Sequence, residues 1–222
     1  MEQLSQEWFD ARKGRVTGSQ IGAILGVNPW SSTKDAMRSI LGQSTFTGNV
    51  ATEYGSRNEE NAVFDFELET GITIKECGFI VHPEYDWLGA SPDGLIGADA
   101  IAEIKCPFGL REKPDPEFKS LAHMPHYYAQ VQYEMFFSER TTAYFIQWNR
   151  FNPPPDRKST RLNSSHRCIS YGRAFAAKHF ILNLGIIVRH MCQAFKFRVG
   201  LFTQTKRAFN LGNGIRSNQT IR

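Results

Sequence analysis

The 222-residue sequence has few cysteines, no long apolar run and, in its last third, almost no acidic residues. Its four cysteines form no C-x-x-C pair, and no histidine cluster has zinc-finger spacing, which argues against a structural zinc site. The longest apolar run, residues 180–188, is about half of the ~20 residues that a membrane span needs. No apolar signal-peptide core follows Met1. We therefore expect a soluble cytoplasmic protein without a membrane span, whose cysteines are buried free thiols rather than a disulfide framework.

The shortage of acidic residues is confined to one end of the chain. Residues 1–155 contain 13 Lys and Arg against 21 Asp and Glu, a net charge of −8. Residues 156–222 contain 13 Lys and Arg and a single acid, Asp156, a net charge of +12. The overall charge of +4 therefore hides a break in composition at one position and does not by itself indicate nucleic-acid binding.

The break coincides with the string "DRKSTRLNSSH" at residues 156–166, which resembles one reading frame of a common sequencing-library adapter; the resemblance continues to residue 175. We therefore expect residues 1–155 to form the natural domain, truncated at its C-terminus, and residues 156–222 to be a non-native read-through tail without function. The alternative is a genuine basic arm that binds phosphates. Resequencing the source gene across residues 152–175 separates the two interpretations.

The first 155 residues change from helical to strand periodicity and back. Apolar residues at helical spacing, bounded by capping residues and glycines, predict helices over residues 5–14, 16–26, 31–42 and 51–71. Strands are then predicted over residues 72–82, 87–90 and 100–106, a helix over 115–139 and a last strand over 141–149. This order predicts an α/β or α+β domain with a central sheet covered by helices. Trp30 is expected in its core.

The stretch "SPDGLIGADAIAEIKCP" (91–107) contains the residues best suited to chemistry. Glu103 and Lys105 are two positions apart in a strand and therefore share one face, and Asp93 would lie opposite Glu103 if two neighbouring strands pair. Two carboxylates with the Ile104 backbone carbonyl make an oxygen-rich site for Mg²⁺ or Mn²⁺, beside a lysine that can position and help deprotonate an attacking water. The alternative is a solvated ion pair worth well under ~1 kcal/mol.

The motif Pro92-Asp93 followed by Glu103-x-Lys105 resembles the core of PD-(D/E)XK nucleases. This motif lies within six segments that match in order, over which the chain resembles the phage lambda exonuclease or YqaJ-type viral recombinase family across residues 5–150: "WFDARKGRVTGS" (8–19), "YGSRNEENA" (54–62), "SPDGL" (91–95), "EIKCPF" (103–108), "YYAQVQYEM" (127–135) and "AYFIQW" (143–148). The resemblance implies a restriction-endonuclease-like core, a mixed sheet flanked by helices. The family's last strand and helix would be missing, because the adapter-like string intervenes.

The resemblance also implies a role for individual residues. Asp93, Glu103 and the Ile104 carbonyl would bind metal, and Lys105 would serve the attacking water. The remaining matches are Glu59 and Gln132 as further active-site residues, and Arg12 and Ser19 as ligands of the 5′-phosphate of a DNA end. Without the resemblance, Glu59 would be a solvated helix residue, Gln132 a surface amide and Ser19 an ordinary helix cap.

The implied activity is Mg²⁺-dependent 5′→3′ digestion of one strand of linear double-stranded DNA, with two ions (Mg²⁺, or alternatively Mn²⁺) at the site. The product would be a 3′ single strand for an annealing protein, and the enzyme a homotrimeric ring encoded by a phage or prophage. One alternative is another PD-(D/E)XK endonuclease or a repair nuclease. An iron–sulphur cluster is not expected, because only Cys77 and Cys106 lie in the natural region. The other alternative is an inactive DNA-end-binding fragment.

Overall fold

The computed structural model describes residues 3, 5–83, 85–151 and 170–173. The chain divides into two compact units, Met1–Ala177 and Lys178–Arg222, and every described residue belongs to the first. Within the described ranges, no helix has both the length and the apolar character needed to cross a membrane.

Four helices come first in the chain, as predicted. They are α1 (Gln6–Arg12), α2 (Gly18–Ile24), α3 (Thr33–Ile40) and α4 (Val50–Thr70). Each begins after a polar residue of the type that satisfies free backbone N–H groups: Ser5, Thr17, Ser32 and Asn49. The longest, α4, ends at Gly71, which adopts a left-handed conformation with φ of 69°.

A mixed four-stranded sheet forms the centre of the domain, which confirms the predicted fold class. Its strands are β3 (Gly94–Ile96), β4 (Ala100–Lys105), β5 (Thr142–Gln147) and β6 (Ser170–Arg173), in that spatial order. The β3–β4 and β5–β6 pairs are antiparallel, and β4–β5 is parallel. The edge strand β6 falls within the segment that we interpret as a read-through tail; the rest of that segment lies outside the described residues.

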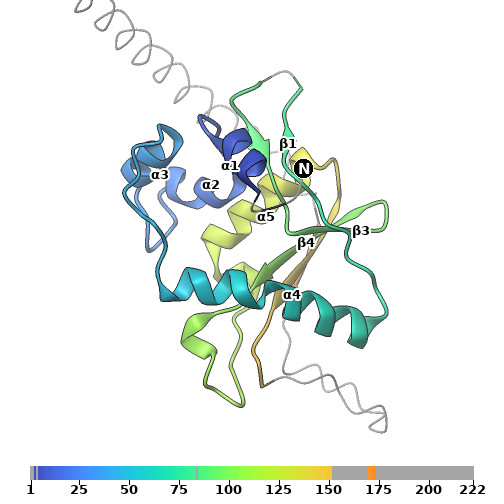
Figure 1. Ribbon diagram of the computed structural model, residues 1–222. Helices are drawn as coiled ribbons and strands as arrows, with labels where there is room; N and C mark the ends of the chain where they lie inside the picture. The colour runs from blue at the N-terminus through green and yellow to red at the C-terminus, as the bar shows by residue number, and fades with distance from the viewer. Residues whose placement is uncertain (1–2, 4, 84, 152–169, 174–222) are drawn as a thin grey trace, which may run out of the picture. The chain divides into compact units, whose positions relative to one another are not determined.

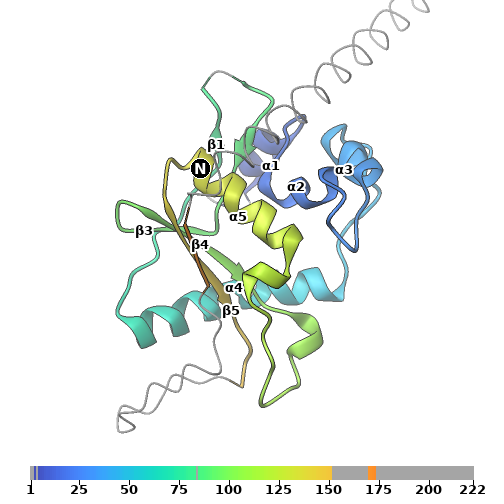
Figure 2. The same ribbon diagram turned by 180° about the vertical axis from the view of Figure 1, so that it is seen from behind.

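Helices cover both faces of this sheet. Figures 1 and 2 show α4 on one face and α5 (Pro125–Phe137) on the other. Ala102 and Ile104 of β4 pack with Phe66 of α4, whereas Ile101 packs with Val131 of α5. Because side chains alternate along a strand, Glu103 and Lys105 must emerge on the α5 face.

Close packing of α2 against α5 places α2 on the same side of the sheet as α5. A Cβ on Gly22 would lie 2.9 Å from the His126 Cβ, so only glycine permits this approach. Further along α5, the buried Tyr133 hydroxyl lies 3.0 Å from the Val16 carbonyl and 3.3 Å from the Gly89 carbonyl, and donates to this pair. Thus α5 is tied to the segment before α2 and to the small sheet of β1 (Ile80–Val81) and β2 (Gly89–Ala90).

Three local predictions differ from the structure. Of the strand predicted over 72–82, only Ile80–Val81 pairs as a strand, because the earlier part contacts β3 through a single bridge at Lys75. Conversely, β3 lies between the predicted strands 87–90 and 100–106, where no strand was predicted. The helix predicted from 115 begins at Pro125, after the short 3₁₀ turns η1 (Phe108–Leu110) and η2 (Leu121–His123).

Candidate active site

Strand pairing brings Asp93 to Glu103, as the sequence predicts. Gly94 pairs with Ala102, so the preceding Asp93 lies opposite Glu103 at the end of the ladder. The Asp93 Oδ2 accepts a hydrogen bond of 2.6 Å from the Ile104 backbone N–H. Lys105 Nζ forms an ion pair with Glu103 Oε1. The Glu103 side chain is fully buried, so this is not the solvated pair of the alternative interpretation.

The helix α5 adds two residues that the sequence analysis missed, Gln130 and Glu134. Gln130 Nε2 donates to Glu103 Oε1 at 2.6 Å and to Glu134 Oε1 at 3.2 Å. Glu134 is 2% exposed. Gln130 and Glu134 are four residues apart and therefore share one helix face. The spacing of four residues between these two polar side chains was the signal in the sequence that could have identified them.

Gln132, which the resemblance implies at the active site, is not brought to these carboxylates. It is fully buried on α5, its Nε2 lies 4.0 Å from Met135 Sδ, and its Oε1 has no hydrogen-bond partner. Residues two apart on a helix point in nearly opposite directions, so Gln130 and Gln132 cannot both face Glu103. In this structure Gln130 holds the position that we predicted for Gln132.

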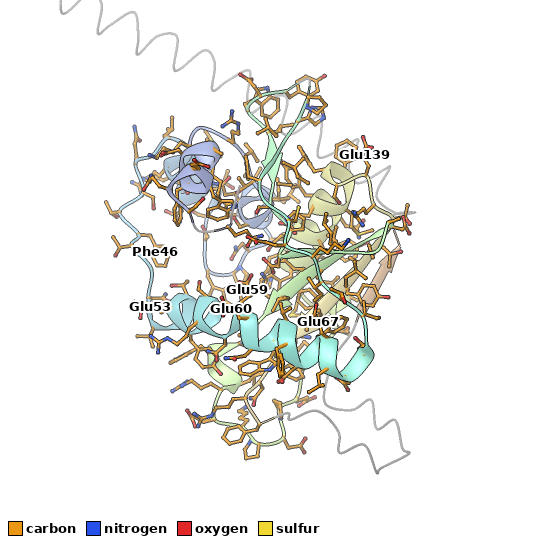
Figure 3. The ribbon with its side chains drawn as sticks, turned by 45° about the vertical axis from the view of Figure 1, so that its right-hand side comes forward. Phe46, Glu53, Glu59, Glu60, Glu67 and Glu139 are labelled. Carbon is orange, nitrogen blue, oxygen red and sulfur yellow. The ribbon has the colours of Figure 1, made fainter. Side chains whose placement is uncertain are left out.

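Glu59 approaches the same group from α4. Figure 3 shows Glu59 next to Glu60 on this helix, nearer than Glu60 to the strands. Burial raises the pKa of Glu59, the charge of Lys105 opposes this shift, and the charge of Glu103 adds to it. These interactions place Glu59 within the electrostatic range of Glu103 and Lys105, as the resemblance implies, and separate it from an ordinary solvated helix acid.

The site holds more carboxylates than its single lysine can neutralise. Burial, reinforced by the charge of Glu103, raises the pKa of both Asp93 and Glu134 well above the usual range. Burial alone would lower the pKa of Lys105, but the charges of Glu103 and Asp93 outweigh it and raise this pKa. Such a group of carboxylates is stabilised by an added cation.

Two buried carboxylate oxygens test whether a metal ion fits. Glu103 Oε2 and Glu134 Oε2 are buried and have no hydrogen-bond partner. A buried, unpaired carboxylate oxygen beside a second carboxylate, Asp93, is the hard donor that Mg²⁺ or Mn²⁺ prefers. Among the residues that the structure describes, no three His, Cys, Asp or Glu side chains form a metal-binding group. A site would therefore need backbone or water oxygens besides these carboxylates.

Arg12 and Ser19, predicted to bind a 5′-phosphate, lie together. Arg12 Nη2 lies 3.3 Å from both Thr17 Oγ1 and Ser19 Oγ, and these hydroxyls are 3.3 Å apart. The Arg12 guanidinium also lies over the Trp8 ring, 4.1 Å from its centroid. A guanidinium held beside two hydroxyls presents several donors to one anion. We call Arg12, Thr17 and Ser19 the hydroxyl–arginine cluster.

An aromatic group lies beside the lysine. Lys105 Nζ is 5.3 Å from the centroid of the Tyr127 ring, and Trp30 packs edge-on against the neighbouring His126, with centroids 4.9 Å apart. The prediction that Trp30 belongs to the core is wrong, because 74% of this residue is exposed. Trp30 contacts α5 with one edge while most of its ring surface remains open to solvent.

The prediction of buried free cysteines is confirmed for the two cysteines that the structure describes. Cys77 and Cys106 are both free and buried. Burial, reinforced by the charge of Glu59, raises the pKa of Cys106 to about 12, so its thiol stays protonated at neutral pH. Cys168 and Cys192 lie outside the described residues.

The fold and this site together define the chain as a protein of the PD-(D/E)XK class: a mixed sheet between helices, with Asp93, Glu103 and Lys105 at the end of one strand pair. Within that class, residues 7–141 match the model of the YqaJ-like viral recombinase domain, and the chain belongs to this family.

Two relatives match about two thirds of this chain. The uncharacterized protein YqaJ of Bacillus subtilis (strain 168) is 30% identical over 161 residues, which cover 68% of this chain and 49% of that protein. The uncharacterized protein R354 of Acanthamoeba polyphaga mimivirus is 25% identical over 159 residues, which cover 66% of this chain and 29% of that protein. The chain thus spans half or less of either relative.

Solved exonuclease structures share the fold. The alkaline exonuclease LHK-Exo from Laribacter hongkongensis superposes with a TM-score of 0.70 at 24% identity, covering 92% of this chain and all of that one. The same enzyme in complex with dAMP gives 0.68 at 23% identity. A phage-related exonuclease from Haemophilus somnus 129PT gives 0.58 at 15% identity, covering 86% of this chain and 96% of that one.

Proposed function

We propose that this protein is a metal-dependent deoxyribonuclease that digests one strand of linear double-stranded DNA from its 5′ end and leaves a 3′ single strand. The observation that carries the proposal is the buried Glu103, which is paired with Lys105, lies opposite Asp93 and retains one unpartnered oxygen. The exonuclease names of the structural neighbours support the reaction class.

In this proposal Asp93, Glu103 and the Ile104 carbonyl hold Mg²⁺ or Mn²⁺, with two ions as the family resemblance implies. The bound metal supplies positive charge that offsets the negative charge developing on the phosphate during hydrolysis. Glu59 borders this group from α4, and Gln130 fixes the orientation of the Glu103 carboxylate through its 2.6 Å hydrogen bond.

In this proposal Lys105 orients the attacking water. Its side chain is 23% exposed whereas that of Glu103 is fully buried, so Lys105 is the member of this ion pair that solvent reaches. The ion pair with Glu103 limits the orientations available to the ammonium, and its raised pKa keeps it protonated at neutral pH. Lys105 therefore acts as a positive hydrogen-bond donor to water and phosphate rather than as a neutral base.

The hydroxyl–arginine cluster supports the proposed 5′→3′ direction of digestion. A 5′-phosphate seated on Arg12 and Ser19 would place the first phosphodiester of that strand towards the carboxylates, so digestion would start at 5′ ends. Arginine binds a terminal phosphate through two parallel hydrogen bonds, which a 5′-hydroxyl end cannot accept.

The partners belong to the same proposal. Residues 1–155 carry a net charge of −8, so DNA binding would depend on a local basic group and on metal rather than on overall charge. We further propose a homotrimeric ring that hands its 3′ strand to an annealing protein, encoded by a phage or prophage and acting in the bacterial cytoplasm. Relatives in a bacterium and a virus support this setting.

The test is digestion of matched linear and closed circular forms of one plasmid with Mg²⁺, using the full chain. Loss of the linear form with the circle intact, and release of 5′ nucleotides first from a 5′-labelled end, supports the proposal. Cutting of the circle indicates an endonuclease instead. A chain that binds DNA ends but releases no nucleotide with Mg²⁺ or Mn²⁺ contradicts the enzymatic proposal.

A further inference from the structure

Glu134 is the buried acidic residue to which the resemblance assigns no role. It is 2% exposed, its Oε1 accepts from Gln130, and its Oε2 has no hydrogen-bond partner. Burying a carboxylate without full pairing opposes folding, and an apolar or amide side chain of similar size would avoid this cost. Packing alone therefore does not account for an acid at this position.

On one side, Glu134 shares the Gln130 amide with Glu103, and burial, reinforced by the Glu103 side chain, raises the pKa of Glu134. Gln130 Nε2 has two hydrogens, and it lies 2.6 Å from Glu103 Oε1 and 3.2 Å from Glu134 Oε1. The acceptor on Glu134 therefore fixes the rotation of the Gln130 amide about its last bond. Without that acceptor, the amide could turn its oxygen toward Glu103 and repel it.

On the other side, Glu134 touches the backbone between the two hydroxyls of the hydroxyl–arginine cluster. A Cβ on Gly18 would lie 2.9 Å from both Cγ and Cδ of Glu134, so the side chain packs directly against this glycine. Gly18 separates Thr17 from Ser19, the residues that contact Arg12. The charge of Glu134 also acts on the Arg12 guanidinium.

We infer that Glu134 is a positioning residue that couples the hydroxyl–arginine cluster to the Gln130–Glu103 pair. In this role Glu134 acts through Gly18 and Gln130, not through contact with the DNA. Through its contact with Gly18 it fixes the distance between the site for the terminal phosphate and the carboxylates, and through Gln130 it fixes the orientation of Glu103. The inference rests on the proposed function, because it assigns Glu134 a role in the choice of 5′-phosphorylated ends.

The test compares Glu134→Gln with Glu139→Gln in the full chain. Glu139 is an exposed glutamate in the turn after α5, and Figure 3 shows it far from Glu59, so it is the matched control. Rates are measured on one linear duplex carrying either 5′-phosphate or 5′-hydroxyl ends. Dissociation constants for both duplexes are measured with Ca²⁺, so that binding is compared even if no digestion occurs.

Glutamine keeps the size of Glu134 and one acceptor oxygen, but it loses the charge that acts on Arg12 and brings donor hydrogens next to the Gln130 donor. We expect Glu134→Gln to lower kcat on phosphorylated ends about tenfold, since a displacement of about 1 Å at a reacting centre costs up to roughly 10²-fold. On hydroxyl ends kcat should fall less, so that the ratio of the rates on phosphorylated and hydroxyl ends becomes smaller. Glu139→Gln should match the parent. In an Arg12→Ala background, which has already lost the phosphate contact, Glu134→Gln should not change the end preference further.

A structural role alone predicts a different pattern. If Glu134→Gln changes the unfolding midpoint but leaves both the end preference and kcat per folded molecule unchanged, or lowers the rates on both ends equally, the inference is wrong. A parent that digests no DNA but binds phosphorylated ends more tightly contradicts the proposed nuclease function alone; the binding ratio of the Glu134→Gln variant then decides the role of Glu134. A parent that neither digests nor discriminates in binding overturns both.

Discussion

The two glutamines of α5 provide the sharpest comparison between the family resemblance and the structure. The resemblance assigns the active-site glutamine to residue 132, whereas the structure places Gln130 against Glu103 and buries Gln132 among apolar neighbours. The matched substitutions Gln130→Met and Gln132→Met keep the length of each side chain and remove its amide.

The expected magnitudes follow from the hydrogen bonds that each amide makes. Gln130 donates to two buried carboxylates, and hydrogen bonds to charged groups contribute about 1.5–3 kcal/mol each. Because Glu103 retains Lys105, we expect Gln130→Met to lower the free energy of unfolding by about 2 kcal/mol. Freed from its donor, the Glu103 carboxylate can rotate, and we expect kcat to fall about 10²-fold.

Gln132→Met should have the opposite signature. Its amide oxygen is buried without a partner, and its nitrogen makes only a long contact with sulfur, so an apolar side chain removes an uncompensated polar group. We expect the free energy of unfolding to stay the same or rise by about 1 kcal/mol, with kcat unchanged.

The assays are urea unfolding followed by circular dichroism and nucleotide release from a 5′-phosphorylated linear duplex with saturating Mg²⁺. The reasoning is refuted if Gln132→Met abolishes nucleotide release at unchanged stability, or if Gln130→Met releases nucleotides at the parental rate.

Three further predictions concern the carboxylates and the lysine. Lys105→Ala should lower nucleotide release by at least about 10²-fold while DNA-end binding, measured by gel shift, stays near the parental value; equal digestion would remove Lys105 from the mechanism. Asp93 has a raised pKa, so its protonated form favours the fold and this stabilisation is lost as pH rises from about 4 through that pKa. In EDTA the unfolding temperature of Asp93→Asn should therefore rise relative to that of the parent as pH increases. A difference in unfolding temperature that stays constant between pH 4 and 8 contradicts this. Adding Mn²⁺ in place of EDTA at pH 8 should raise the unfolding temperature of the parent but not of Glu103→Ala, and an equal rise in both would place the ion elsewhere.

Local signals allowed much of the framework to be predicted. The caps at Ser5 and Ser32 and the alternation around Glu103 depend on neighbours in the sequence, so helices, central strands and the Asp93–Glu103 pairing could be inferred. The first part of the strand predicted over residues 72–82 is not a strand, because β propensity does not reveal that only Lys75 finds a pairing partner there.

The rest of the site could not be read from local pattern. The role inferred for Glu134 depends on the packing of α5 on Gly18, a contact between residues 116 positions apart. The choice between Gln130 and Gln132 depends on the rotation of α5 about its axis, which the sequence does not specify because polar residues lie on opposite sides of this helix: Gln130 and Glu134 on one, Gln132 on the other. Trp30 was misplaced for a related reason: its size predicts burial, but its ring packs beside His126 and Tyr127 of α5 and the residue stays 74% exposed.

The attachment of α5 has a consequence for how the protein fluctuates. This one helix donates from Tyr133 to the segment before α2, packs through His126 on Gly22 and holds Glu103 through Gln130. An opening that releases α5 must therefore break all three sets of contacts together, so α2, α5 and the end of β4 should exchange their amide hydrogens as one cooperative unit. The arrangement therefore argues against a partial unfolding that frees α2, with Ser19, while α5 and the Glu103 end of β4 stay assembled. The two groups of predicted site residues should be lost or kept together.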